Sequence, residues 1–274
     1  MVGGVLFNLL MGAIIDHFEA KGEIRTSFII AAATIFLLTV LHTLTLVLSR
    51  EKPAPKIPDN VSIVRRFKNV FGDKTIMKVI GISVFWTICT HITTAFYGTY
   101  QTKELGFDMK FVAILSIIYS AVRIPASFIL ARIADRRSFA HMLKYAYALA
   151  VLGFMVATFM VPSNGKLFYT TYACLYAAAM GGINSAETNI IFDYVSPEKR
   201  SDALMVKQAV YGLAGFFATL AVTPLVTFIQ NNGNRIFGIN IYAQQVLSAI
   251  SVVLGILVII YLQKVVLKIK PHKD

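Results

Sequence analysis

Long apolar runs separated by short polar segments are the feature of this sequence that most restricts its fold. Most of the runs hold 18 or more residues with few charges, enough for an α-helix to cross the roughly 30 Å hydrocarbon core of a bilayer. Apolar residues fill 57% of the 274 positions and charged residues only 15%, against about 25% charged residues in soluble domains. The strict alternation typical of membrane barrel strands does not occur in these runs. The sequence therefore predicts an all-α membrane protein.

The apolar runs predict about eight transmembrane helices. The first run is only about 22 Å long as a helix, which is short for a span. We therefore expect the beginning of this helix to be missing from the chain, with a tilted or interfacial helix as the alternative. The expected ranges are Met1–Ile15, Thr26–Leu48, Ile76–Tyr100, Phe111–Ile133, His141–Val161, Leu167–Val195, Ala203–Ile229 and Ile239–Val266.

The longest polar segment separates the second run from the third. It contains Pro53, Pro55 and Pro58, which interrupt helices and stiffen the chain. The following stretch, Val61–Phe71, places its apolar and basic residues on two helical faces. That pattern is typical of a short helix on an anionic membrane surface. A solvated linker with chance amphipathicity is the alternative.

Lysine and arginine residues are concentrated in alternate loops. Nineteen of the 26 lie in residues 49–78, 131–144, 196–207 and 264–274, and six lie in the intervening loops. The positive-inside rule places the first set, with both termini, in the cytoplasm. The net charge of +12 is thus a topology signal. No nucleic-acid-binding motif accompanies it, so we expect no nucleic-acid partner.

Two local sequences and the order of the helices carry a resemblance to a known family. The segment Ile129–Ser138 places a small residue, Ala131, four positions before Asp135, which is followed by Arg136 and Arg137. This looks like the loop signature of major facilitator superfamily (MFS) transporters, although Ala131 and Ser138 stand where that family often has glycine. The segment Asp193–Leu204 resembles the short loop between their tenth and eleventh helices. Two helices, a basic linker and six helices then match the order of helices five to twelve.

The resemblance implies a domain organisation. Residues 1–48 would be two helices of the N-terminal bundle, 49–75 the basic cytoplasmic linker, 76–267 the six-helix C-terminal bundle and 268–274 a cytoplasmic tail. The MFS fold consists of two such bundles that rock about a central site. The missing N-terminal helices would then be a required partner of this chain.

The resemblance also implies a function. This function is secondary active transport of a small solute by alternating access across the plasma membrane. The transport could be coupled to protons or to another ion. The chain would act as part of a longer transporter. A truncated, non-transporting half-protein or scaffold is the alternative. Sugars, organic acids, peptides and drugs all remain open as substrates.

Few ionisable residues fall within the predicted spans, and two of them, Arg123 and Glu187, are candidates for the substrate or ion pathway. A charge at bilayer depth costs about 2.5–3.5 kcal/mol on insertion scales, so it persists where it faces a cavity or a partner. A structural salt bridge between the two is the alternative. Asn184 and Thr188 are expected to share the face of Glu187 and to line a water-filled cavity. His91 is a further candidate, with a packed core histidine as the alternative.

The segment after the fourth apolar run contains Asp135 and Arg136, whose role the resemblance also suggests. By resemblance, Asp135 and Arg136 form a conformational-lock loop, in which Asp135 meets a helix N-terminus of the other bundle near Gly3 and Gly4. A solvated Asp135 paired with Arg136 is the alternative. No zinc, P-loop or nucleophile-elbow pattern is present, so we expect no enzyme activity, no cofactor and no metal site. Tyr97 and Tyr100 are expected in an outer aromatic belt.

Overall fold

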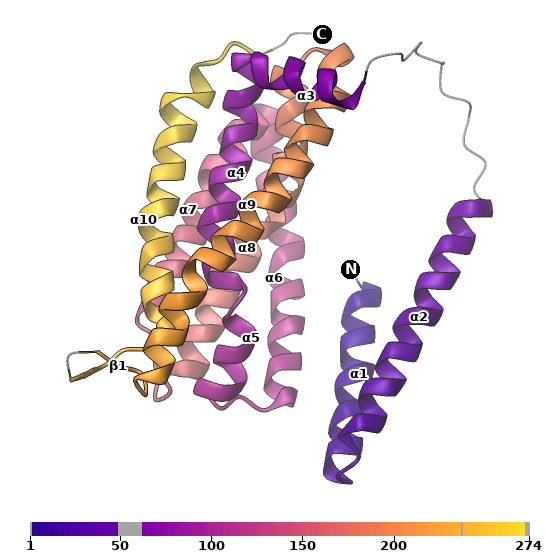
Figure 1. Cartoon of the computed structure of the whole chain (residues 1–274), viewed down its shortest axis with the longest axis vertical. Coiled ribbons are helices and arrows are strands. Elements are labelled where there is room, and N and C mark those ends of the chain that lie inside the picture. The colour runs from indigo at the N-terminus through magenta and orange to yellow at the C-terminus, as the bar shows by residue number, and fades with distance from the viewer. Residues whose placement is uncertain (1, 49–61, 237, 272–274) are drawn as a thin grey trace. The chain divides into compact units, whose positions relative to one another are not determined.

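The computed structural model describes residues 2–48, 62–236 and 238–271 (Figure 1). The chain divides into two compact units. The first comprises Met1–Val61 with Met109–Ser116, and the second comprises Ser62–Asp108 with Ile117–Asp274.

In the first unit, helices α1 (Val2–Ala20) and α2 (Ile24–Leu48) pack against each other as a helical hairpin. Gly22 in the turn adopts a φ of 75°, a conformation that glycine reaches without steric cost. Helix α1 continues through Asp16 to Ala20 and is about 28 Å long. The expected end at Ile15 was therefore wrong, and with it the premise that this helix is too short to span.

The second unit is a bundle of long helices with one short hairpin (Figure 1). An α-helix pairs its backbone groups within one segment, as an apolar solvent requires. The elements are α3 (Ile63–Gly72), α4 (Lys74–Thr94), α5 (Tyr97–Thr99), the π-helix η1 (Tyr100–Glu104), α6 (Met109–Arg136, in this unit from Ile117), α7 (Phe139–Thr158), α8 (Gly165–Tyr194), α9 (Pro197–Asn231), β1 (Arg235–Ile236), β2 (Ile239–Asn240), α10 (Ala243–Lys264) and η2 (Val266–Lys268).

Helix α7 packs against both α8 and α10, and α4 packs against both α9 and α10. Glycines allow the closest approaches. A Cβ atom on Gly255 of α10 would collide with the Val151 side chain of α7, and one on Gly182 of α8 would lie 2.8 Å from Leu130 of α6. Small residues at such crossings are typical of membrane helices, where close packing replaces the hydrophobic effect as the force between helices.

Six helical segments in the described part of the chain are long and apolar enough to cross a membrane: Arg25–Leu48, Lys74–Glu104, Met109–Arg136, Phe139–Thr158, Pro197–Asn231 and Ala243–Lys268. Helix α8 is also long, but its polar residues keep it outside that set. It packs along α7 in the same bundle, and the count of about eight spans stays a prediction. The all-α membrane fold is confirmed.

The two ends of the second unit differ. Helix α3 and the C-terminal end of α10 lie at one end, and the β1–β2 hairpin lies at the other (Figure 1). Helix α3 confirms the helical reading of Val61–Phe71 from residue 63 onward. Its Ile63 and Val64 side chains are 67% and 77% exposed, and the prolines that precede it in the linker lie outside the described residues.

Three predicted boundaries were wrong for identifiable reasons. Helix α9 begins at Pro197 after the N-cap Ser196, because a proline is well suited to a first helical turn whose N–H groups have no partner. Helix α6 runs through Arg136, so Asp135 and Arg136 lie in its last turn and not in a loop. Residues Ile239–Asn240, expected to begin the last helix, form strand β2.

Candidate functional site

Six polar side chains from four helices come together inside the second unit and form what we call the buried polar cluster. Helix α4 contributes two of them, α9 two, and α7 and α8 one each. The members are Thr87, His91, Tyr147, Glu187, Lys207 and Tyr211.

Glu187 and Lys207 are the charged members of the cluster, and both are almost fully buried, at 7% and 6% exposed. The Lys207 ammonium donates a hydrogen bond to the backbone carbonyl of Glu187 and interacts electrostatically with its carboxyl. No salt bridge within 4 Å joins the two side chains. Carboxylate atom Oε1 of Glu187 has no hydrogen-bond partner among the described residues. Lys207 lies about 15 Å along α9 from Pro197, so the pair is deep within the bundle.

Tyr147 fills the side of the cluster that faces the core. Its ring stacks on Trp86 with the centroids 4.4 Å apart, and the residue is completely buried. Its hydroxyl lies near the Glu187 carboxyl and interacts with it electrostatically, but makes no hydrogen bond among the described residues. The hydroxyl of Thr87 is buried without a hydrogen bond as well. Buried hydroxyls of this kind are uncommon in native proteins and call for an explanation.

His91 lies one helical turn beyond Thr87 on α4, and its Nδ1 is 3.1 Å from the Thr87 carbonyl oxygen. Its ring meets the Tyr211 ring edge to face, with the centroids 6.0 Å apart. Gly215 of α9 leaves room for the ring, since a Cβ atom there would lie 2.9 Å from His91 Cδ2. The half-buried His91 is therefore packed between α4 and α9 and is an outer member of the cluster.

The structural salt bridge between Arg123 and Glu187, which was the alternative to a pathway role, is not present in the structure. Both residues lie in its described part, and no salt bridge joins them. Arg123 is half-buried on α6, where its charge interacts with Tyr119 of the same helix. The partner of Glu187 is Lys207 on α9 instead.

Asn184 and Thr188 do not share the environment of Glu187, which corrects the expectation of one common face. Both are exposed on the surface of the second unit, whereas Glu187 points into it. Neighbouring residues in an α-helix are about 100° apart. Residues 184 and 188 therefore align with each other, while residue 187 is turned toward the core.

The sequence did not predict four members of the cluster: Thr87, Tyr147, Tyr211 and the charged residue Lys207. Lys207 was counted among the charges of residues 196–207, although it lies near the start of the expected helix Ala203–Ile229. The Ser196-Pro197 pair is the signal that locates it correctly, since a serine N-cap followed by proline marks a helix start. A start at Pro197 places Lys207 almost three turns inside the helix.

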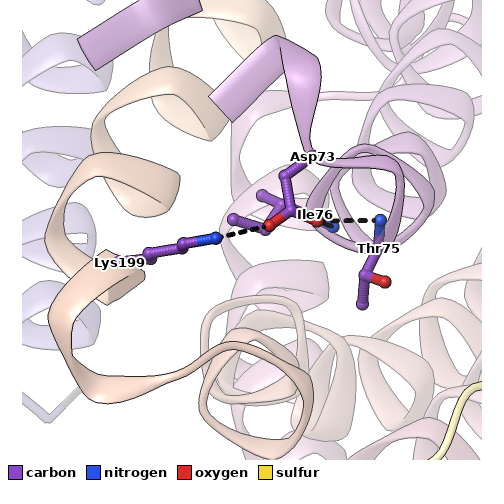
Figure 2. Close-up of polar contacts among 4 residues, drawn as sticks. All are labelled: Asp73, Thr75, Ile76 and Lys199. Atoms are coloured by element: carbon purple, nitrogen blue, oxygen red, sulfur yellow. Dashed lines mark hydrogen bonds and ion pairs between the residues drawn. The ribbon is translucent and has the colours of Figure 1, made fainter. Parts of the chain in front are cut away.

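Charged residues of a different kind lie at the end of the unit that carries α3. Asp73 ends α3 and begins α4, and its Oδ1 accepts hydrogen bonds from the backbone N–H groups of Thr75 and Ile76 at 3.0 and 3.3 Å (Figure 2). Its Oδ2 accepts one from Lys199 of α9 at 2.8 Å. The hydrogen bond from Lys199 holds the pKa of the Asp73 carboxyl below its ordinary value.

A second ion pair, between Arg66 of α3 and Asp202 of α9, lies at the same end with an N–O distance of 2.9 Å. We call these two ion pairs the α9 clamp. Asp135 and Arg136 are exposed at the end of α6, and the described residues show no ion pair between them.

Two other predictions concern a metal site and an outer aromatic belt. No group of three or more His, Cys, Asp or Glu residues there could hold a metal ion. Tyr97 and Tyr100 are buried, at 6% and 2% exposed, and Tyr100 donates a hydrogen bond to the Met160 carbonyl. They belong to the core, not to the predicted outer belt.

Comparison with known proteins identifies the family. The profile of the Major Facilitator Superfamily matches residues 1–219, a range that includes every member of the buried polar cluster. A search of curated proteins found no significant match. The match covers well over half of the chain and agrees with the apolar spans, so this chain belongs to the Major Facilitator Superfamily and is an integral membrane protein of the transporter class.

Proposed function

We propose that this chain moves a small solute by proton-coupled secondary transport, with Glu187 as the residue that binds and releases the proton. The observation that carries the proposal is the environment of its carboxyl, which is deep in the bundle, has one unpartnered oxygen and lies beside Lys207 without a salt bridge. Burial penalises an ionised carboxyl, and a nearby ammonium favours it. Its proton affinity therefore depends on small displacements of Lys207.

Alternating access would supply such displacements. In the family, two six-helix bundles rock about a site near the middle of the membrane. Glu187 is on α8 and Lys207 on α9, so a shift between these helices changes the separation of the two charges. Asn184 and Thr188 are exposed on the same helix as Glu187. We propose that Asn184 and Thr188 face the solute path, and that Glu187 and Lys207, on the core side of this path, respond when a solute occupies it. Arg123 on the neighbouring α6 is a further proposed pathway residue.

The domain assignment remains part of the proposal. Residues 1–48 would supply two helices of the N-terminal bundle, 49–75 the cytoplasmic linker and 76–267 the C-terminal bundle, within a longer transporter of the plasma membrane. The lock between Asp135 and the start of α1 depends on the same assignment. Helix α3 would lie on the cytoplasmic membrane surface, where its exposed Ile63 and Val64 enter the lipid interface.

The experiment uses everted membrane vesicles that contain the polypeptide and are acidified inside by the host respiratory chain. A pH-sensitive acridine dye reports proton efflux by antiport when a sugar, an organic acid, a dipeptide or a cationic drug is added outside, and proton efflux by symport when the vesicles are preloaded with the same solute. We expect at least one class to cause efflux, and we expect Glu187→Gln to abolish it. Glu23→Gln is the matched control, because Glu23 is exposed in the turn between α1 and α2. Efflux that survives in Glu187→Gln would remove Glu187 from the coupling role.

Uptake of the same solutes, labelled with radioisotope, separates the remaining possibilities. Uptake that persists after a protonophore is added would argue for transport without proton coupling. No uptake of any solute by this polypeptide would favour the non-transporting half-protein.

Membrane orientation has a separate test. In a chain with Cys174 replaced by serine, Arg235→Cys in the hairpin should react with an impermeant maleimide on intact cells, and Lys270→Cys in the tail should react only after permeabilisation. Strand β1, which contains Arg235, and the C-terminal end of α10, which precedes Lys270 in the chain, lie at opposite ends of the second unit (Figure 1). The reverse labelling pattern would contradict the cytoplasmic assignment of both termini.

A further inference from the structure

A groove with three arginines lies between the C-terminal end of α6 and the start of α7. It encloses about 370 Å³. We call it the basic groove, and its lining residues are Ile129, Arg132, Ile133, Arg136, Arg137 and Tyr145.

The α6 side of the basic groove is a helical stripe. Residues 129, 132, 133 and 136 follow the i, i+3, i+4, i+7 spacing of one helix face, so isoleucines and arginines alternate along it. All three arginine side chains are exposed, and none of them forms an ion pair with an acidic residue in the described part of the chain. Asp135 does not line the groove. The groove therefore presents uncompensated positive charge.

The depth of the groove along α6 corresponds to the level of lipid headgroups. Helix α6 has 28 residues and is about 42 Å long, which exceeds the roughly 30 Å hydrocarbon core. Its last turn, with Arg136, must then extend into the headgroup region. Phe128 and Ile129 lie two turns earlier and are 67% and 61% exposed. A ligand in the groove would thus meet arginines at its head and apolar side chains below.

We propose that the basic groove binds the phosphate-bearing headgroup of an anionic membrane lipid. Guanidinium groups bind phosphate oxygens through paired hydrogen bonds, and the Tyr145 hydroxyl adds a further donor at the rim, where that residue is 42% exposed. Basic pockets between membrane helices on the cytoplasmic side suit such headgroups. The apolar lining residues Ile129 and Ile133 favour a lipid over a free phosphate ion, because a phosphate ion makes no apolar contacts. The inference is independent of the proposed proton coupling.

The test is thermal unfolding of the full chain in neutral detergent, with phosphatidylglycerol, phosphatidylcholine or inorganic phosphate added. We expect phosphatidylglycerol alone to raise the melting temperature. The shift should fall by at least half in the double variant Arg136→Gln/Arg137→Gln. Lys268→Gln/Lys270→Gln, which removes the same charge from exposed positions in the tail, should keep the full shift.

Three results would overturn the proposal. An equal shift with inorganic phosphate would make the groove a site for a soluble anion. Equal losses in the arginine and lysine variants would show diffuse surface attraction. An undiminished shift in the arginine variant would place the lipid elsewhere. If the glutamine variant does not fold, Arg136→Lys/Arg137→Lys keeps the charge but loses the paired hydrogen bonds, and its shift should still be smaller than that of the wild type.

Discussion

Two lysines of α9 each lie beside a carboxylate, one pair at the surface of the second unit and the other buried in its core. At Asp73 and Lys199, both carboxylate oxygens accept hydrogen bonds, and the lysine side chain is 59% exposed. At Glu187 and Lys207, both residues are buried, one carboxylate oxygen is unpartnered and the ammonium hydrogen-bonds to a backbone carbonyl. In the first pair the hydrogen-bonding groups of the carboxylate all have partners, and the pair holds the start of α4 against the start of α9. The second leaves a carboxylate oxygen without a hydrogen bond, an arrangement that fits the protonation change proposed for Glu187.

The largest expected effect comes from the same substitution in both pairs. Lys207→Met should lower the free energy of unfolding by about 3–5 kcal/mol, because it leaves the Glu187 carboxyl buried without its cation. Lys199→Met should cost less than about 1 kcal/mol, since exposed ion pairs contribute little. Denaturant titration of the purified protein in detergent measures both. If both variants lost a similar amount of unfolding free energy, the buried pair would not differ energetically from the exposed pair.

A double variant sharpens this result. Glu187→Gln/Lys207→Met should be more stable than Lys207→Met alone, because the uncompensated charge is gone. The corresponding pair at the surface, Asp73→Asn/Lys199→Met, should show a coupling well below that of the buried pair.

Packing around His91 gives the next largest effect. Gly215→Ala should destabilise the protein by about 1–3 kcal/mol, the usual cost of overpacking, because the new methyl group would collide with the His91 ring. Gly212→Ala on the same helix is the matched control, since a Cβ atom there has nothing within 4 Å. That change should be neutral or stabilising through helix propensity. Melting temperatures compare the two, and equal values would mean that the ring is free to move aside.

The Asp73 cap should have a smaller effect. Asp73→Ala removes the hydrogen bonds to Thr75 and Ile76 and the ion pair with Lys199, and should cost about 1–2 kcal/mol. Asp73→Asn keeps an acceptor for the cap and should cost less. If the two substitutions were equally harmful, the ion pair and not the cap would dominate at this position.

The smallest expected effect is a pH dependence of the same residue. The pKa of Asp73 is lowered from its ordinary 3.8, chiefly by the hydrogen bond from Lys199. The stability it contributes is therefore present at neutral pH and is lost as the pH falls through the lowered pKa. The difference in melting temperature between wild type and Asp73→Asn should shrink below about pH 4. A difference that grows in acid would have the wrong sign for this pair.

The sequence predicted the architecture well and the site only in part, for a physical reason. Apolar runs report burial in lipid directly, so the spans followed from them, whereas the family was expected from its resemblance to the segments Ile129–Ser138 and Asp193–Leu204 and to the order of the helices. Which face of a helix turns inward depends on its neighbours. Glu187 stood out as a charge within a span, but Asn184 and Thr188 were assigned to its face from spacing alone, and the structure separates them.

Charges near helix ends were the hardest to interpret. Lys207 was read as a loop residue, although Pro197 already starts the helix that buries it. Asp135 and Arg136 were read as a loop, although α6 continues through them. A shift of one or two turns at a boundary decides whether a lysine belongs to water or to the core.

Asp73 joins α3 to α4 with a single residue, and Lys199 ties that joint to the first turn of α9 (Figure 2). No flexible loop separates α3 from α4, so a movement of one helix is passed directly to the other. A tilt of the first turn of α9 would therefore be transmitted to α3 through Lys199 and through the Arg66–Asp202 ion pair. The start of α9, the end of α3 and the start of α4 thus form one rigid joint.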